Sequence, residues 1–541
     1  MTHVSGQLID IPNRTIYPAT IHFENGIIEK IEKTALAPDQ YILPGFIDAH
    51  VHVESSMLVP SEFGRLAVVH GTVGTISDPH EIGNVLGVAG VEYMIENGKQ
   101  INFKFHFGAP SCVPATIFET AGAEINADDV EYLLKKPEIN YLAEMMNWPG
   151  VLFNDETVFA KIAKAKALGK PIDGHAPGVK GEQAHTYAAA GISTDHECFT
   201  IEEAQDKLDC GMKILIREGS AAKNFEVLIP LLEDHFESIM FCSDDKHPDN
   251  LVEGHINLLV KRALAKGHDL YKILQAACIN PVKHYNMNVG LLQKKDNADF
   301  IIIDDLENFN VQQTWINGQL VAKKGKSNIQ KVENQIVNNF DCHAKTADQF
   351  KVAITGNKVQ VMEALDGQLI SNLLTFDSSL INNSNQTNVS EDLLKITVVN
   401  RYKEAAPAVG FIKNIGLKKG AIASSVGHDS HNIIAVGVDD ESITKAVNLI
   451  IAARGGVSAV GDNQEKLLEL PVAGIMSEKD GYKVAKAYSV IDAFAKSLGS
   501  SLNSPFMTLS FMALLVIPKA KMSDLGFFDG ESFKYIDVFT D

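Results

Sequence analysis

The sequence predicts an α/β protein built around a TIM-like (β/α)8 barrel, with a small composite β-sandwich domain and a C-terminal α+β domain. Three observations support this prediction. Eight strand-like runs alternate with helix-like segments between residues 43 and 290, two short β-rich pieces flank that region, and residues 345–541 mix strands and helices in another pattern. A chain of 541 residues is also too long for one ordinary core, so several domains are expected.

The barrel prediction depends on the eight apolar runs and on what separates them. Amphipathic stretches such as DETVFAKIAKAKALGK lie between them, with apolar residues at helical spacing. Eight strand–helix units in roughly 250 residues are typical of a (β/α)8 barrel. A doubly wound open sheet is the alternative, but no G-x-G-x-x-G follows the first run. The runs are YILPGFIDAH, GTVGTISD, INFKFHFG, INYLAEMM, KPIDGH, GISTDHE, MKILIREGS and SIMFCSDD.

Two flanking pieces are predicted to be β-hairpins. Asn25-Gly26 in ATIHFENGIIEKIEK and Asn317-Gly318 in TWINGQLVAKKG each lie between apolar or alternating runs, which is a strong hairpin signal. We expect residues 1–42 and 291–330 to pair into one composite β domain beside the barrel. The polar stretch KKGKSNIQKVENQIVNN is expected to link it to the C-terminal domain.

Composition restricts the partners and the location. The formal net charge of −20 argues against a nucleic-acid partner, because such proteins need a basic footprint. No run reaches the roughly 18 apolar residues of a membrane span, and the start, MTHVSGQLIDIPNRT, does not resemble a signal peptide. The six cysteines contain no C-x-x-C pair, as is typical of reduced, structural thiols. We therefore expect a cytoplasmic protein with a small-molecule substrate, assembled as a homo-oligomer, with a dimer as the commonest form.

Six side chains lie at the ends of the predicted barrel strands. Because catalytic groups of such barrels lie at the C-terminal strand ends, we expect all six to meet at one rim. Four imidazoles and two carboxylates are a set suited to Zn, Mn or Fe, and residues two apart in a strand share a face. Six ligands exceed the three of a typical mononuclear zinc enzyme, so two ions bridged by Glu144 are expected. The six are His50, His52, Glu144, His175, His196 and Asp244.

Each of these residues also has a structural interpretation when taken alone. A single strand histidine is more often hydrogen-bonded in a core, and Glu144 could be a buried acid with an ion-pair partner. Asp244, in SDDKHPDNL, could cap a helix. It is the joint placement of all six at the expected strand ends that favours a metal site.

Other polar residues on the same rim are candidates for substrate binding. His80 and Glu81 follow the second run and could contact the substrate, or Glu81 could bridge the metals instead of Glu144, or cap the next helix. Arg217 and Ser220 end the seventh run and could shape the pocket, with surface pairing as the alternative.

The late stretch VGHDSHN contains His428, Asp429 and His431 between apolar runs. A turn with its own hydrogen-bond network would explain this cluster. Alternatively, the C-terminal domain covers the barrel mouth and brings His431 to the substrate or the metal.

Several of these stretches resemble a known family. PGFIDAHVH resembles the strand-1 signature of the amidohydrolase superfamily of metallo-dependent hydrolases, and His175, His196 and Asp244 fit its strand 5, 6 and 8 ligands. HVHVESSMLVPSEF, GTVGTISDPHEIGNVLG, SDDKHPDNL and VGHDSHNIIAVG resemble the bacterial adenine deaminases more narrowly, and this resemblance runs through nearly the whole chain. Glu144 stands where many superfamily members have a carboxylated lysine, in agreement with the adenine deaminases.

The resemblance implies the hydrolytic deamination of adenine to hypoxanthine and ammonia in purine salvage. It implies a divalent cofactor, with Mn²⁺ expected first and Fe²⁺ or Zn²⁺ as alternatives. We expect a metal-activated hydroxide to attack C6 of adenine while Asp244 transfers the proton to the leaving amino group and Glu144 holds the metals. HVE, residues 52–54, matches half of the cytidine-deaminase signature, but no P-C-x-x-C exists in the chain.

Three other functions are alternatives. The same metals could hydrolyse a cyclic amide or act on a related nucleobase. A noncatalytic metal-binding protein would predict losses among the six ligands, and none is missing. Nucleic-acid editing is disfavoured by the charge of −20.

Overall fold

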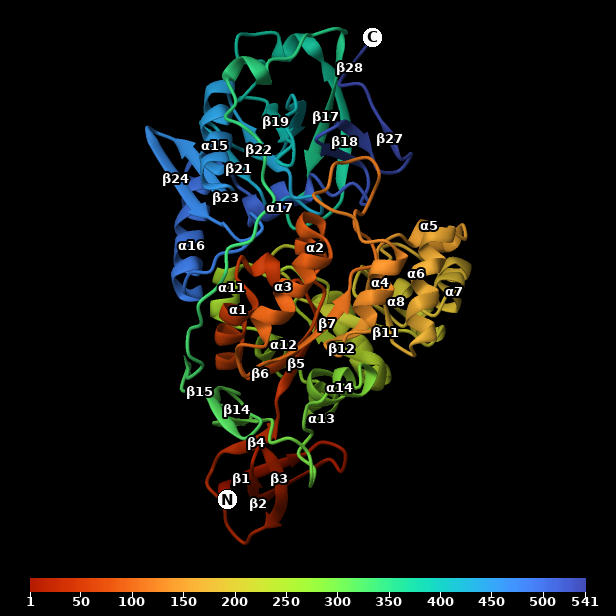
Figure 1. Cartoon of the computed structure of the whole chain (residues 1–541), viewed down its shortest axis with the longest axis vertical. Helices are drawn as coiled ribbons and strands as arrows, with labels where there is room; N and C mark the ends of the chain where they lie inside the picture. Colours follow the sequence, from red (N-terminus) through yellow and green to blue (C-terminus); the bar gives the residue numbers. More distant parts are fainter.

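The computed structural model describes all 541 residues, and its parts follow one another along the longest axis (Figure 1). A β-sheet containing the N-terminal strands lies at one end, parallel strands with helices around them lie in the middle, and the C-terminal third lies at the other end. No helix combines the length and the apolar character that a bilayer span requires.

The middle region is a curled parallel arrangement of eight strands in two sheets. The five-stranded sheet has the order β5-β6-β7-β8-β9, and the three-stranded sheet has the order β10-β11-β12. The sheets approach each other at both edges, because the Asp244 N–H donates to the His50 carbonyl at 2.9 Å and the Ser193 N–H donates to the Ile172 carbonyl at 2.9 Å. The strands are β5 (Phe46–Val51), β6 (Thr72–Ser77), β7 (Lys104–Ala109), β8 (Ile139–Met145), β9 (Ile172–Gly174), β10 (Thr194–Asp195), β11 (Lys213–Arg217) and β12 (Ile239–Cys242).

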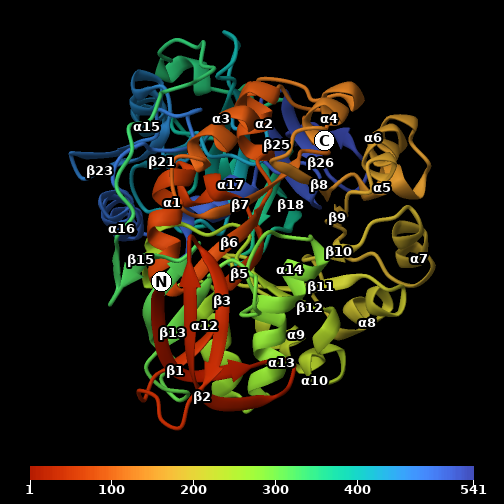
Figure 2. The ribbon, with the colours of Figure 1, turned by 60° about the horizontal axis from the view of Figure 1, so that its bottom comes forward.

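Helices cover the outside of these strands, with α1–α3 on one flank and α4–α8 on another (Figure 2). The predicted amphipathic helix is confirmed as α6: Asp155 caps it by accepting from the Thr157 and Val158 N–H groups, and Ile162 and Ala165 are buried. The helices are α1 (Pro60–Ala67), α2 (His80–Leu86), α3 (Val88–Gly98), α4 (Ala127–Leu134), α5 (Trp148–Leu152), α6 (Glu156–Ala167), α7 (Gly181–Ala189), α8 (Ile201–Asp209), α9 (Phe225–Leu228), α10 (Leu232–His235), α11 (Pro248–Glu253), α12 (Ile256–Ala265), α13 (Leu270–Leu274) and α14 (Asn280–His284).

The first predicted strand is in fact two strands that belong to different sheets. β4 (Tyr41–Pro44) joins the outer sheet, and β5 begins after Gly45. A Cβ atom at Gly45 would lie 2.3 Å from Val73 Cγ1, so only glycine allows the chain to pass this close to β6. The apolar pattern alone could not reveal this break, because both strands are buried.

The outer sheet combines strands from before and after the parallel region, in the order β16-β15-β14-β13-β4-β1-β2-β3. Both predicted hairpins are confirmed, with Asn25 and Asn317 at φ of 53° and 48° and a glycine after each. The strands are β1 (Thr2–Asp10), β2 (Thr15–Glu24), β3 (Ile27–Lys33), β13 (Phe300–Ile303), β14 (Val311–Ile316), β15 (Gln319–Lys323) and β16 (Lys326–Ser327). Phe23, Phe300 and Trp315 pack together within this sheet.

The C-terminal region contains a nine-stranded sheet, a three-stranded sheet and three helices. The nine-stranded sheet follows the order β18-β17-β20-β19-β22-β21-β23-β24, with β28 on β17, and the other sheet is β25-β26-β27. The elements are β17 (Lys358–Ala364), β18 (Ser371–Asp377), β19 (Leu394–Val399), β20 (Ala408–Lys413), β21 (Ala421–Ser424), β22 (Ile433–Gly437), α15 (Asp440–Ala453), β23 (Gly456–Gly461), β24 (Gln464–Glu469), α16 (Gly481–Ser497), α17 (Pro505–Phe511), β25 (Ala520–Ser523), β26 (Gly526–Asp529), β27 (Lys534–Tyr535) and β28 (Phe539–Thr540).

The C-terminal region packs directly against the helices of the parallel region. The Gly481 N–H, at the start of α16, donates to Glu62 of α1 at 3.0 Å. Residues 328–346 form no helix or strand, as predicted for a linker, but they are held in place: the Asn339 amide donates to the carbonyls of Val85 and Gly122. These contacts hold the C-terminal region over the parallel strands.

Candidate active site

The structure brings the six predicted metal ligands together at the C-terminal ends of five strands. His50 lies in β5 and His52 follows it, Glu144 lies in β8, His175 and His196 follow β9 and β10, and Asp244 follows β12. Each is at most 6% exposed. Buried charged and titratable groups at this density need partners or a cation, because isolated buried charges are very costly.

One group of three donor atoms has the spacing expected around a single cation. His52 Nε2 lies 3.2 Å from both His50 Nε2 and Asp244 Oδ1, and His50 Nε2 lies 3.6 Å from the same oxygen. Ligand atoms that are each about 2.1 Å from one metal ion lie roughly 3.0–3.4 Å from each other. The nitrogen and oxygen donors therefore fit a divalent metal.

Glu144 lies between this group and two further histidines. Its Oε1 is 3.3 Å from His52 Nε2, whereas its Oε2 is 2.7 Å from His175 Nδ1 and 3.2 Å from His196 Nε2. Burial would raise the pKa of Glu144, but His175, His196 and His52 outweigh it and hold that pKa well below the usual range. His175 Nε2 is buried without a hydrogen-bond partner. This nitrogen is therefore free to bind a metal ion or another ligand. The two carboxylate oxygens of Glu144 thus face different histidines.

Arg217 is the buried partner of Asp244. Its Nη1 donates to Asp244 Oδ2 at 2.6 Å, and the guanidinium also contacts both oxygens of Glu197. Burial raises the pKa of Asp244, but Arg217, His50 and His52 more than offset this and lower it well below the usual range. Arg217 thus lies behind Asp244 and outside the cavity lining, in contrast to the prediction that it shapes the pocket.

Glu197 is a site residue that the sequence reasoning did not identify. It directly follows His196, lies 3.6 Å from His196 Nε2, and lines the cavity. Its position could have identified it, because Glu197 is an acid at the end of the sixth predicted strand, GISTDHE. Asp245, next to Asp244, also lines the cavity and accepts from Ser55 Oγ at 2.5 Å.

Residues from the C-terminal region complete the site. His428 and His431, in the β21–β22 loop, contact the two carboxylate oxygens of Glu81 at the start of α2, and His80 Nε2 lies 3.7 Å from Asp429 Oδ1. Burial would lower the pKa of His428, but Glu81 and Asp245 raise it to about 9. Glu81 is therefore engaged by this histidine pair, whereas Glu144 faces the other ligands.

The space enclosed by these groups is small. The cavity has a volume of about 20 Å³. Its lining includes His52, His80, Glu81, Glu144, His175, Asp244, His428 and Asp429, and the apolar residues Leu369, Phe511 and Leu514 of the C-terminal region. His431 does not line the cavity, but it contacts Glu81, which does.

The structure does not bring Ser220 to this cavity. The Ser220 hydroxyl donates to Asn250 Oδ1 at 2.7 Å and accepts from the His247 N–H at 2.8 Å. The two bonds join the loop after β11 to the start of α11, which gives Ser220 a structural role in place of the substrate contact expected from its position in the sequence.

Parallel strands with histidines and acids at their carboxyl ends, together with a matching family profile, define the class: the chain is a hydrolase of the amidohydrolase family. The sequence profile of the amidohydrolase family matches residues 41–321, and that of the adenine deaminase C-terminal domain matches residues 368–534. A β-aspartyl dipeptidase structure from Fervidobacterium islandicum AW-1 aligns with 61% of this chain and all of its own, at 14% identity and a TM-score of 0.45, which is too distant to refine the assignment.

Relatives that match over the full length identify the family within this class. Adenine deaminase of Salinibacter ruber is 51% identical, covering 99% of both chains. That of a Sulfurovum species is 54% identical over 98% of both, and that of Methanosarcina mazei is 47% identical over the whole of both. The chain belongs to the adenine deaminase family.

Proposed function

We propose that this protein hydrolyses adenine to hypoxanthine and ammonia. The observation that carries the proposal is the similarity to adenine deaminases over the full length, including the C-terminal domain. The net charge of −20 supports a free base as substrate, because a nucleic acid would be repelled.

The proposed cofactor is a pair of divalent ions, with Mn²⁺ first and Fe²⁺ or Zn²⁺ as alternatives. Histidine and carboxylate donors without thiolates suit all three metals, and the two oxygens of Glu144 face different histidines, as a bridge requires. When bound, such ions supply the Lewis acidity that lowers the pKa of water. The proposed ligands are His50, His52, Glu144, His175, His196 and Asp244.

Asp244 is proposed as the proton-transfer group. It accepts a proton from the attacking water as the C6–O bond forms, and gives it to the amino nitrogen as the C6–N bond breaks, so that water and adenine yield hypoxanthine and ammonia. Arg217 holds Oδ2 at 2.6 Å and leaves Oδ1 directed toward His50 and His52. This orientation keeps one carboxylate oxygen on the cavity side.

His80 and Glu81 are proposed to contact the purine, since both line the cavity. His431 is proposed to act indirectly by fixing one Glu81 oxygen, while His428 fixes the other. A base with ring nitrogens and an amino group matches such a set of donors and acceptors.

We propose that the two parallel sheets form one (β/α)8 barrel over residues 43–290, beside a composite β domain of residues 1–42 and 291–330 and a C-terminal domain of residues 345–541; the hydrogen bond from the Asp244 N–H, just after β12, to the His50 carbonyl of β5 supports closure. Six unpaired cysteines support a cytoplasmic location, where adenine deamination would serve purine salvage. A homodimer is proposed on the general frequency of such assemblies.

The test is ammonia release from adenine by purified protein whose metal content has been measured. Hydantoin, dihydroorotate and guanine are assayed in parallel, since they separate adenine deamination from other amidohydrolase reactions. We expect turnover on adenine alone. A fully metal-loaded preparation that leaves adenine unchanged, or that opens a cyclic amide instead, would refute the proposal.

A further inference from the structure

The cavity among the metal ligands is too small for a purine. A volume of about 20 Å³ accommodates about one water molecule. The apolar residues Leu369, Phe511 and Leu514 close it on the C-terminal side. A base whose C6 faces Asp244 must therefore extend beyond this cavity into a neighbouring space.

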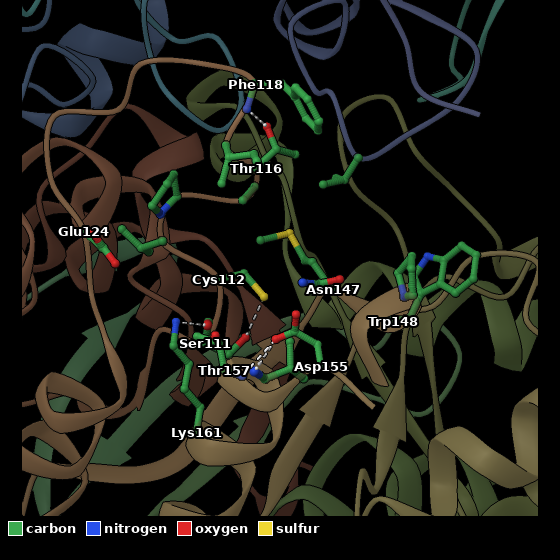
Figure 3. Close-up of a pocket in the computed structure, with 18 of the residues that line it drawn as sticks. Ser111, Cys112, Thr116, Phe118, Glu124, Asn147, Trp148, Asp155, Thr157 and Lys161 are labelled. Atoms are coloured by element: carbon green, nitrogen blue, oxygen red, sulfur yellow. Dashed lines mark hydrogen bonds between the residues drawn. The ribbon is translucent and has the colours of Figure 1, made fainter. Parts of the chain in front are cut away.

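A larger cavity, whose lining is drawn in Figure 3, shares a lining residue with the site. This second cavity of about 530 Å³, within the range of about 300–1,000 Å³ typical of small-molecule sites, lies at the C-terminal ends of β7 and β8. It is lined by the segment that follows β7, from Ser111 to Phe118, by the segment that follows β8, from Met146 to Pro149, and by the start of α6. Val516 and Phe533 of the C-terminal region cover part of it.

Met146 lines both cavities. It directly follows β8, two residues after Glu144, and its unbranched thioether side chain can change rotamer at low cost. Ser111, which lines the larger cavity, donates its hydroxyl to the Glu144 carbonyl at 2.5 Å. The larger cavity therefore borders the strand that carries the proposed bridging carboxylate.

The lining of the larger cavity suits a flat, uncharged ring. Trp148 and Phe118 contribute aromatic side chains to the lining, and Cys112, Val113 and Met146 are apolar. Of the charged groups in the lining, Lys161 Nζ donates to the Ser111 carbonyl at 2.7 Å and Asp155 caps α6, whereas Glu124 has no ion-pair partner. One ammonium beside two carboxylates gives an anionic ligand no advantage over a neutral purine.

We propose that this cavity is an antechamber that admits the purine and holds it beside Trp148 before it passes Met146 to the metal ligands. The inference rests on the proposed function, because it takes the substrate to be a purine. It adds an access route and names Trp148 and Met146 as residues that the base contacts outside the metal cluster.

Fluorescence tests the antechamber directly. The chain has 2 tryptophans, and the other, Trp315, lies in β14 of the outer sheet. Trp315→Phe leaves Trp148 as the single reporter, and hypoxanthine, which has no amino group to lose, is titrated into the metal-loaded enzyme. We expect a saturable change in emission over the concentrations at which hypoxanthine inhibits ammonia release. Trp148→Phe, which retains Trp315, is the matched control and should show no change.

Kinetics of a blocked antechamber provide the second measurement. Thr157→Trp adds a bulky side chain to the lining at the start of α6, and Ala163→Trp places the same residue on an exposed part of that helix outside the lining. For Thr157→Trp we expect kcat/KM for adenine to fall about tenfold with kcat and metal content unchanged, as for a loss in substrate access. Ala163→Trp should keep wild-type values.

The results separate the two proposals. If wild-type protein does not deaminate adenine, the proposed function fails. If it does, but Trp148 emission is unaffected by inhibitory hypoxanthine, or Thr157→Trp matches Ala163→Trp, the antechamber is wrong and the proposed function stands.

Discussion

At the scale of single residues, the Arg217 guanidinium determines the charge state of the site. It is 1% exposed and lies between Glu197 and Asp244, so two buried acids share one buried cation. Removing one member of such a buried set is costly, because the remaining charges lose their compensation without regaining water.

Arg217→Met should therefore lower the free energy of unfolding by about 3–5 kcal/mol, measured by urea denaturation. Arg217→Lys keeps the charge but loses the two-pronged contact, so a smaller loss is expected. Arg14→Met, which breaks the partly exposed pair with Asp269, is the matched control and should cost at most about 1 kcal/mol. Equal losses for Arg217→Met and Arg14→Met would contradict this account.

Asp244→Asn tests the proposed proton transfer. The substitution keeps the size of the side chain but removes the carboxylate that takes up the proton. We therefore expect kcat for adenine to fall by about 10²–10⁴-fold in a steady-state ammonia assay. Asp39→Asn, at an exposed position, should change nothing. Retention by Asp244→Asn of both full metal content and near-normal turnover would rule out the role given to Asp244.

At the scale of elements, the strand ends were the predictable part of the site. His-x-His after an apolar run, and single histidines or acids after later runs, depend only on strand period and on the geometry of parallel sheets. The hairpins at Asn25 and Asn317 were predictable for an equally local reason, since both turns require positive φ.

What depends on tertiary packing was not predictable. The break at Gly45 arises from the proximity of Val73, and Ser220 turns away from the cavity to bond Asn250. The strand order of the C-terminal sheet, in which β17 pairs in parallel with β20, joins segments that no local pattern relates. The pairing of His428 with Glu81 likewise joins residues that are far apart in the sequence.

The β21–β22 loop and the start of α2 should be held together in a pH-dependent way. The folded pKa of His428, about 9, is above its usual value of 6.5, so its stabilising charge is fully present below pH 6.5 and is lost as the pH rises through about 9. As the pH rises through that window, deprotonation of His428 should lower the free energy of unfolding by up to about 1.4 kcal/mol per pH unit.

His428→Gln should therefore flatten the pH dependence of unfolding between pH 6.5 and 9, as measured by urea denaturation at a series of pH values. His343→Gln, at an exposed histidine that contacts Glu404, is the control and should keep the wild-type slope. An unchanged slope in His428→Gln would show that the Glu81–His428 pair does not hold the loop.

At the scale of the whole molecule, the site unites distant parts of the chain. The proposed ligands come from β5, β8 and the segments after β9, β10 and β12, and the C-terminal region supplies residues that close the cavity. A cation bound at this point links five strands that no single helix or loop connects, so its binding free energy becomes stability of the whole fold.

Removal of the metal by a chelator should lower the thermal midpoint, measured by calorimetry. Metal at 1,000 times its Kd contributes about 4.1 kcal/mol to the folded state, and this is lost on chelation. In Glu144→Gln, where the proposed bridge is weakened, chelation should have a smaller effect. If chelation stripped the wild-type metal without moving the midpoint, the site would not have this stabilising role.

The outer sheet has a consequence for how the chain is made. β4 is flanked by β1 on one side and by β13 on the other, and β13 is synthesised much later. At about 5–20 residues per second, the roughly 250 residues between Pro44 and Phe300 take on the order of 10–50 s to emerge from the ribosome. Until then the nascent chain exposes an open strand edge, a template for aggregation that chaperones must shield.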